Sequence, residues 1–434
     1  MSPELIGLLG ILVLFVLLIL RIPVAIALAV VGFVGVWVLN SWNAALSTLS
    51  TEAFTVASKS ELVVVPLFIL MGNVAGETGM SRRLYDAAYA VIGQLRGGLA
   101  SATIIGCGGF AALSGSSVAS ALTMGKVSLA EMDRFNYAPS LSTGAVAAGG
   151  TLGILIPPST GFVIYAILAQ ESIGRLFLAG VLPGLLLLGL FVLTITILCS
   201  IWPALGPAGP HTTWREKARK MVGAGPIVLV ILLTIGGIYG GIFSPVEAAA
   251  VGAGLVILGG IIERKLSLAA LWRACRDSVV TTATVMLILI SASLINPFLA
   301  LSQVPALVGT FLGGLDVAPV VVLGLILLSY LILGCFLEGF AMLVLTMPIY
   351  FPVITALGID PILFGVLVVL VLEMGLISPP VGVNVFIVKS VAPKVPLGTI
   401  FRGVMPFWLA MLVCTALIIA FPQIALILPT TMIQ

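Results

Sequence analysis

The sequence predicts an all-α polytopic membrane protein with two inverted-topology repeats, about ten transmembrane helices and two re-entrant hairpins. Hydrophobic residues make up 61% of the 434 residues, charged residues make up 8%, and the mean hydropathy is +1.29. Apolar runs of about 20 residues, the length of a membrane-spanning helix, recur along the chain. Short motifs also recur at a separation of about 222 residues, which indicates a duplicated unit.

The first repeat is expected to occupy residues 1–200. Its predicted elements are helices at 4–20, 23–40 and 62–77, a hairpin at 97–126, a broken helix at 140–170 and a helix at 176–200. The opening run lacks a basic segment and a cleavage site, so we expect a spanning helix there and not a signal peptide. Glycines and serines interrupt the hairpin region near its centre, and each half is too short to span. Pro157 and Pro158 interrupt the uncharged run at 140–170, because proline stops a helix.

The second repeat is expected at 223–434, after a basic cytoplasmic connector at 201–222. Its predicted elements are helices at 223–243, 245–262 and 278–300, a hairpin at 319–353, a broken helix at 362–388 and a helix at 404–428. Amphipathic segments at 81–96 and 303–316 precede the two hairpins and are typical of helices that lie at the membrane surface. A third amphipathic segment, 267–277, is expected on the cytoplasmic face.

Matching motifs align the two repeats. Ile156–Pro158 matches Ser378–Pro380, and Gly180–Pro183 matches Gly403–Pro406. Each unit contributes five crossings, so the second unit starts on the opposite side of the membrane from the first. Lysine and arginine support this layout, because nearly all of them fall in loops on one side, which the positive-inside rule makes cytoplasmic. Lys59 and Arg175 fall on the other side, and both termini are expected to be periplasmic.

The interrupted helices are the candidate binding sites. A helix broken inside a membrane exposes N–H groups on one half and C=O groups on the other, and these ends carry opposite partial charges. Each hairpin tip and the neighbouring break could therefore hold a small monovalent cation, with an anionic substrate between the two cations. Serines and glycines at helix crossings are more often packing residues. The presence of the same arrangement in both halves favours binding sites.

The candidate residues form three sets. Those of the first cation site are Ser114, Gly115, Ser116, Ser117, Gly150, Thr151, Gly153, Pro157 and Ser159. Those of the second cation site are Gly334, Glu338, Gly339, Gly375, Ser378, Pro379 and Gly382. Those of the substrate site are Ser116, Pro158, Ser159, Thr160, Pro380 and Asn384.

Carboxylates inside a membrane are costly and therefore indicate function. Glu338 lies at a predicted hairpin tip, and Glu373 lies two residues before a predicted break. Each could bind a cation, hold a proton or pair with backbone N–H groups. Glu247 lies in the first turn of a predicted helix, where its charge complements the helix dipole.

Several classes of protein find no support in the sequence. Gly125-Lys126-Val127 lacks the glycine and the hydroxyl of a nucleotide-binding P-loop, and the single histidine, His211, lies in a loop, which argues against an intramembrane protease. The five cysteines have no C-x-x-C spacing and are expected to be packing residues. We expect no enzymatic activity and no nucleic-acid partner. An ion channel remains an alternative, because broken helices also line selectivity filters.

Several long motifs carry a resemblance to a known family. Residues 66–88, 114–128 (S-G-S-S-V-A-S-A-L-T-M-G-K-V-S), 143–159 (T-G-A-V-A-A-G-G-T-L-G-I-L-I-P-P-S) and 375–386 are similar to the large membrane (M) subunit of tripartite ATP-independent periplasmic (TRAP) transporters. The similarity covers essentially the whole chain.

The resemblance implies an elevator-type transporter of the bacterial inner membrane, with Na⁺ as the coupling ion and no other cofactor. It places sodium sites at 114–117 with 149–159 and at 334–339 with 375–384. It also implies two protein partners, a small four-helix membrane (Q) subunit, expected as a separate chain, and a periplasmic substrate-binding (P) protein. Membrane lipid would surround the chain. The cargo would be a small organic anion such as a C4-dicarboxylate, keto acid or sugar acid. A stand-alone sodium–dicarboxylate symporter of the related fold is the alternative within this class.

Overall fold

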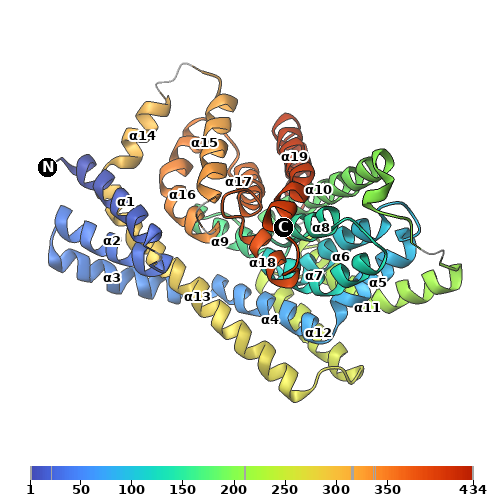
Figure 1. Cartoon of the computed structure of the whole chain (residues 1–434). Coiled ribbons are helices and arrows are strands. Elements are labelled where there is room, and N and C mark those ends of the chain that lie inside the picture. The colour runs from blue at the N-terminus through green and yellow to red at the C-terminus, as the bar shows by residue number, and fades with distance from the viewer. Residues whose placement is uncertain are drawn as a thin grey trace.

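The computed structural model describes residues 2–20, 22–209, 212–313, 317–335, 337 and 339–432, with the backbone alone at 311–313. Helices make up nearly all of this part of the chain, and no strand is present in it (Figure 1). Seven of its helices are long and apolar enough to cross a membrane, or eight if the bent pair at Pro139–Leu155 and Thr160–Ala169 counts as one span. The predicted class, an all-α polytopic membrane protein, is therefore confirmed.

The first half of the chain contains ten α-helices and two short 3₁₀ helices within the described residues. They are α1 (Pro3–Ile19), α2 (Val24–Leu39), α3 (Trp42–Ala57), η1 (Ser60–Val63), α4 (Val64–Glu77), α5 (Met80–Ile92), α6 (Gly98–Ser114), α7 (Ser117–Arg134), α8 (Pro139–Leu155), α9 (Thr160–Ala169), α10 (Ile173–Ile201) and η2 (Pro203–Leu205).

The second half contains ten α-helices within the described residues. They are α11 (Trp214–Tyr239), α12 (Pro245–Ile262), α13 (Leu268–Leu301), α14 (Val304–Gly313), α15 (Pro319–Gly334), α16 (Gly339–Ala356), α17 (Pro361–Leu376), α18 (Val383–Val391), α19 (Leu397–Ala420) and α20 (Gln423–Thr430).

The order of elements after α4 recurs after α13. A short helix (α5 or α14) leads into a pair of successive helices (α6 and α7, or α15 and α16). An interrupted helix (α8–α9 or α17–α18) and a long helix (α10 or α19) follow. Within the described residues the order of these elements is therefore the same in the two halves.

Four parts of the sequence-based layout differ from the structure. Helix α3 was missed, because its serines, threonines and Glu52 dilute its apolar face. The segments 267–277 and 278–300 form the single helix α13, since neither glycine nor proline separates them. The connector 201–222 becomes helical at Trp214, where Thr213 and Glu216 form a capping box for α11. The helix placed at 404–428 is divided into α19 and α20 at Phe421 and Pro422.

The two halves pack closely around their interrupted helices. Helix α18 lies against α7 and α8, and α9 lies against α16 and α17, so each half covers the hairpin of the other. Helices α8 and α19 cross at Gly144 and Gly403, where a Cβ on Gly403 would collide with the backbone of Ser140. Glycines at this crossing permit backbone contact, as is typical of membrane helix interfaces. The helices that carry the interruptions are therefore closely packed against one another.

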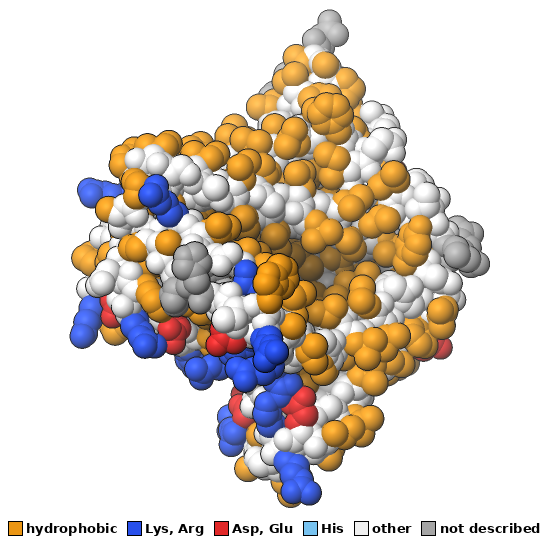
Figure 2. All heavy atoms as spheres, turned by 90° about the vertical axis from the view of Figure 1, so that its right-hand side faces the viewer, with side chains coloured by type: hydrophobic (Ala, Val, Ile, Leu, Met, Phe, Trp, Pro, Cys, Tyr) orange, Lys and Arg blue, Asp and Glu red, His pale blue; other side chains and the backbone are white. Residues whose placement is uncertain are grey.

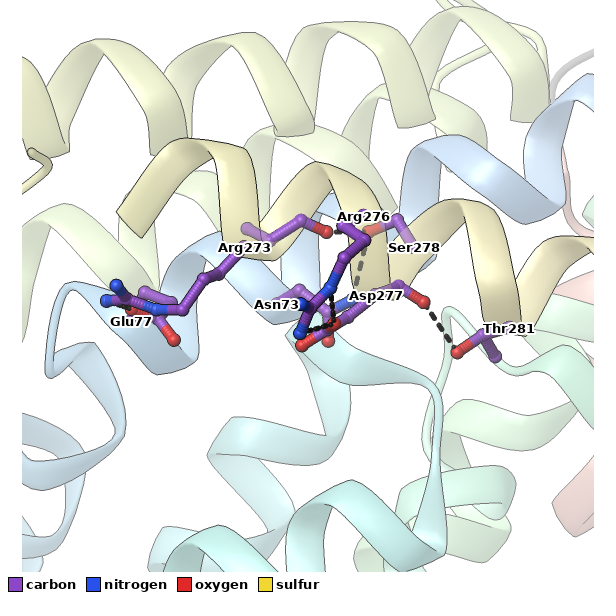
Figure 3. A network of polar contacts seen from close by, with 8 residues as sticks. Asn73, Glu77, Arg273, Arg276, Asp277, Ser278 and Thr281 are labelled. Carbon is purple, nitrogen blue, oxygen red and sulfur yellow. Dashed lines mark hydrogen bonds and ion pairs between the residues drawn. The ribbon is translucent and has the colours of Figure 1, made fainter. Parts of the chain in front are cut away.

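Polar contacts join helices of the two halves away from that core. Figure 3 shows Arg273 of α13 reaching Glu77 of α4, with an Nη2–Oε2 distance of 2.6 Å. In the same view Asn73 Nδ2 donates to Ser278 Oγ at 2.9 Å, and Ser278 Oγ donates to the carbonyl of Ala274 at 2.6 Å. These bonds tie α4 to the long helix α13.

Candidate functional site

The tip of the first hairpin is a two-residue reversal between α6 and α7. Gly115 ends α6 with φ +58°, a left-handed conformation that favours glycine. Ser116 follows in an extended conformation, and its hydroxyl caps α7 by accepting from the N–H of Ala119 at 3.3 Å. The serine-rich sequence thus places the C-terminus of one helix beside the N-terminus of the next.

The break between α8 and α9 faces this tip. Helix α8 ends at Leu155, Ile156 is extended, and Ser159 caps α9 by accepting from the N–H of Phe162 at 3.2 Å. The two helix axes are bent by 40°. The prolines at 157 and 158 therefore interrupt the helix as the sequence predicted, and both are buried.

Hydrogen bonds join the tip directly to the break. Thr160 Oγ1 donates to the carbonyl of Gly115 at 2.8 Å, and the N–H of Thr160 donates to the same oxygen at 3.3 Å. The contact requires small residues, because a Cβ on Gly115 would lie 2.6 Å from the Pro158 carbonyl oxygen. A Cβ on Gly153 would collide with the Ser116 carbonyl. The structure thus brings Gly115, Ser116, Gly153, Pro158 and Thr160 together.

Most hydroxyl groups at this junction already make protein hydrogen bonds. Thr151 Oγ1 donates to the Ala148 carbonyl at 2.6 Å, Ser159 Oγ donates to the Ile154 carbonyl, and the Ser114 and Ser120 hydroxyl oxygens lie 3.2 Å apart. A serine or threonine oxygen that donates its proton keeps lone pairs for a cation. These bonds therefore orient the candidate ligands without using up their oxygens.

Ser117 differs from its neighbours. Its side chain is 1% exposed, and its Oγ atom has no hydrogen-bond partner among the described residues. It lies in the first turn of α7, directly after the tip, and its backbone oxygen faces Gly150, where a Cβ would be 3.2 Å away. Since a buried hydroxyl without a partner is unfavourable, this position suits a bound polar species.

The second hairpin packs its tip against α17. A Cβ on Gly375 would lie 2.7 Å from the Gly334 Cα, and a Cβ on Gly339 would lie 2.9 Å from Leu372 Cδ2. Gly334, Gly339 and Gly375 are thus close together, as the sequence suggested for the second site. Glu338 lies outside the described residues. Glu373 is buried inside α17.

The second break, 377–382, differs from the first in its surroundings. Ser378 Oγ donates to the Met374 carbonyl at 2.6 Å and accepts from Trp408 Nε1 at 2.9 Å. Trp408 comes from α19 and was not among the candidate residues, since nothing in its sequence context marks it. Pro379 and Pro380 are exposed, and Gly382 starts α18 with φ +60°. The second break is therefore open to the surface while the first is enclosed.

Asn384 is the most unusual polar residue of the second break. Its side chain is 0% exposed, and neither its Nδ2 nor its Oδ1 has a hydrogen-bond partner among the described residues. It lies in the first turn of α18, which packs against α7 and α8 of the first half, with Val391 near Gly125. An amide offers both donors and an acceptor, so Asn384 could bind an anion, a cation or both.

The two junctions together can bind charged species without charged side chains. Six helix ends lie at the tips and breaks. They are the N-termini of α7, α9 and α18 and the C-termini of α6, α8 and α17. N-termini carry a partial positive charge and C-termini a partial negative charge. Such a set of opposed helix ends, with backbone and hydroxyl oxygens, is typical of ion and substrate sites in secondary transporters.

Comparison with known proteins gives a consistent result. Residues 11–424 match the family model described as "Tripartite ATP-independent periplasmic transporter, DctM component". The chain is 37% identical over 386 residues to the C4-dicarboxylate TRAP transporter large permease protein DctM of Pseudomonas aeruginosa, covering 88% of this chain and 89% of that protein. It is 34% identical over 423 residues to the isethionate TRAP transporter permease protein DctMQ of Oleidesulfovibrio alaskensis, covering 94% of this chain and 64% of that protein.

A solved structure supports the fold. The YdaH transporter of Alcanivorax borkumensis aligns with a TM-score of 0.64 and 17% identity, covering 86% of this chain and 87% of that one. At this identity the likeness concerns the fold alone.

Proposed function

Because the chain belongs to the DctM family of TRAP transporters, we propose that it is the transport subunit for sodium-driven import of a small organic anion. The observation that carries the proposal is the pair of hairpin-and-break junctions, with the unpartnered polar groups of Ser117 and Asn384 beside them. The cations would bind at the two junctions and the anion between them. Relatives carry names of transporter permeases, which are not enzymes.

Sodium coupling has a simple energetic basis. Each net positive charge that moves inward gains about 2.3 kcal/mol per 100 mV of membrane potential. Two or more sodium ions per dianion would therefore concentrate the anion without ATP, provided that substrate binds well only when the sodium sites are filled. The proposed movement is an elevator, in which hairpins and interrupted helices travel together while α1–α4 and α11–α13 remain in place.

Partner proteins follow from the family. TRAP large permeases work with a substrate-binding protein and a small membrane subunit, and the name of the DctMQ relative combines the letters of the M and Q subunits. We propose that this chain uses a small subunit made as a separate polypeptide and a periplasmic binding protein. Its cargo belongs to the small organic anions, such as the C4-dicarboxylate or isethionate named in its relatives.

The decisive experiment is uptake into proteoliposomes that contain this chain and its small subunit. Labelled C4-dicarboxylate, isethionate and a sugar acid would be offered with and without the binding protein and an inward sodium gradient. Uptake that needs both is the expected result. Uptake that ignores the binding protein would favour a stand-alone symporter, and ohmic current in planar bilayers without saturable uptake would indicate a channel. Uptake that ignores sodium would contradict the two cation sites.

A further inference from the structure

A long apolar groove runs between α11 on one side and α5, α6 and α10 on the other. Its volume is about 780 Å³, and among the described residues no charged side chain lines it. Leu84, Ala112 and Leu185 lie on one wall, and Met221 and Val228 lie on the other. In Figure 2, which views the side where α5 and α11 lie, this face is hollowed, and hydrophobic side chains surround the hollow. The groove is thus an apolar opening at membrane depth.

The dimensions of the groove select the kind of occupant. Its lining follows α11 from Met221 to Tyr239, about 27 Å at about 1.5 Å per residue. A helix about 10 Å across and as long as this lining would occupy roughly 2,100 Å³. The groove, at about 780 Å³, is too small to take in a whole helix of a partner protein. A single extended hydrocarbon chain is thin enough to lie in it.

The start of α11 supplies a charged end to the groove. Lys217 lies one helical turn before Met221 and Trp214 nearly two turns before it, which places both on the face that lines the groove. Lys217 Nζ lies 5.5 Å from the centroid of the Trp214 ring, and Trp214 is 85% exposed. Among the described residues Lys217 has no carboxylate partner, whereas Lys220 pairs with Asp86 at 2.9 Å. Lysine and tryptophan are the residues that meet lipid headgroups at a membrane surface.

We propose that the groove binds one acyl chain of an anionic glycerophospholipid of the cytoplasmic leaflet, with the headgroup phosphate at Lys217. A basic site beside membrane helices on the cytoplasmic side attracts anionic headgroups. Ile156 and Pro157 also line the groove, so the bound chain contacts the back of the first break. The lipid therefore fills the space between α11 and the helices that carry the first candidate site.

Native mass spectrometry of the purified chain, with phosphatidylglycerol or phosphatidylcholine added, tests the proposal. Val228→Trp fills the groove from α11, and Leu229→Trp is the matched control, since Val228 and Leu229 are 45% and 56% exposed but Leu229 does not line the groove. Gly109→Leu fills it from α6, and Gly189→Leu, which faces open space on α10, is its control. We expect each filling variant to lower bound phosphatidylglycerol at least about tenfold and each control to leave it unchanged.

The headgroup contact is tested separately. Lys217→Gln should weaken phosphatidylglycerol binding about fivefold and leave phosphatidylcholine binding unchanged. Arg215→Gln, which removes an equal charge from another face of α11, should have little effect. If Val228→Trp and Gly109→Leu both fold and still bind phosphatidylglycerol as the wild type does, the groove is not the lipid site. If the protein binds the two lipids equally well and Lys217→Gln has no effect, Lys217 does not bind the headgroup. Cross-linking of Val228→Cys to a helix of the small subunit would also overturn the proposal.

Discussion

At the scale of single residues, Ser117 and Asn384 differ from the other polar residues of the two junctions. Ser117 comes from the first hairpin and Asn384 from the second interrupted helix, and both side chains are buried without hydrogen-bond partners among the described residues. A buried polar group without a partner costs about 1–3 kcal/mol. A ligand that supplies the missing bonds would remove this cost, so sodium or substrate binding should also stabilise the folded protein.

Ser117→Ala should reduce sodium-dependent uptake and raise the sodium concentration needed for half-maximal rate, because it removes a free oxygen beside the first tip. Ser128→Ala is the matched control. Ser128 lies on the same helix and is buried, but its hydroxyl donates to the Met124 carbonyl at 2.8 Å. Uptake assays over a range of sodium concentrations would compare the two. An equal sodium dependence in both variants would contradict a role for Ser117 in cation binding.

Asn384→Leu should abolish uptake while leaving the protein as stable as the wild type, or more stable by about 1 kcal/mol. The substitution removes two buried polar atoms that have no hydrogen-bond partner among the described residues. Thermal unfolding in detergent and substrate uptake are the two measurements. Loss of stability together with loss of uptake would show that Asn384 is a structural residue.

It was easier to predict from the sequence where the two junctions lie than which side chains meet there. Gly115 and Gly153 could be found because a Cβ at either position would collide with the facing backbone, and Pro158 could be found because proline interrupts a helix. Trp408 could not be found, because its bond to Ser378 joins α19 to the second break, and these segments meet only in the folded protein. The burial of Asn384 likewise depends on the packing of α18 against α7 and α8.

At the scale of elements, ion pairs fix the short helix α5 to the helices around it. Arg83 of α5 binds Glu263, which follows α12, and Arg83 Nη1 lies 2.6 Å from Glu263 Oε1. Asp86, one turn further along α5, pairs with Lys220 of α11. The Arg83 guanidinium lowers the pKa of the Glu263 carboxyl, and the hydrogen bond to Glu263 raises the pKa of Arg83. Helix α5 is thereby tied to α11 and α12 just before the first hairpin begins.

Glu263→Gln should lower the stability of the protein by up to about 1 kcal/mol, the usual range for a partly exposed ion pair. Because the pKa of Glu263 is lowered in the folded protein, the pair stabilises the fold above the ordinary carboxyl pKa. That contribution is lost as the pH falls through the lowered value. Thermal unfolding between neutral and acidic pH would measure it, and the double exchange Arg83→Glu with Glu263→Arg should restore part of the stability. Failure of the exchange to restore any would argue against a direct pair.

Element boundaries were predictable where glycine or proline marks them. The breaks near Pro157 and Pro379 and the start of α12 at Pro245 follow directly from those residues. Helix α3 is hard to predict because its serines and threonines dilute its apolar face. The change from polar to apolar composition inside α13 suggests a boundary, but the helix continues through it. Composition indicates which part of a helix faces lipid, but a change in composition does not by itself terminate a helix.

For the whole molecule, charged groups gather in a way that agrees with the proposed orientation. The ion pairs Arg83–Glu263, Lys220–Asp86 and Arg273–Glu77 all join segments that the positive-inside rule assigns to the cytoplasm. Lys59 and Glu171, assigned to the opposite side, line one polar hollow together with Gln170. Segments expected on the same side of the membrane are therefore neighbours in the structure.

Cysteine labelling in intact cells should confirm this orientation. After Cys275 and Cys335 are replaced by alanine, Glu171→Cys should react with a membrane-impermeant maleimide applied from the periplasmic side. Arg219→Cys should react only after the inner membrane is permeabilised. The three other cysteines are buried and should contribute little background. The opposite pattern would mean that the chain is inserted the other way round.

The unbroken length of α13 has a practical consequence. This helix has 34 residues and is about 51 Å long, well beyond the roughly 30 Å of the hydrocarbon core, so its basic first turns must emerge from the bilayer. In Figure 1 it runs past α2, α3 and α4 as one continuous helix. A spectroscopic label on α13 would therefore provide a fixed point of reference. Distances measured from it to labels on the hairpins, with and without sodium, would show whether the hairpins move as proposed and by how much.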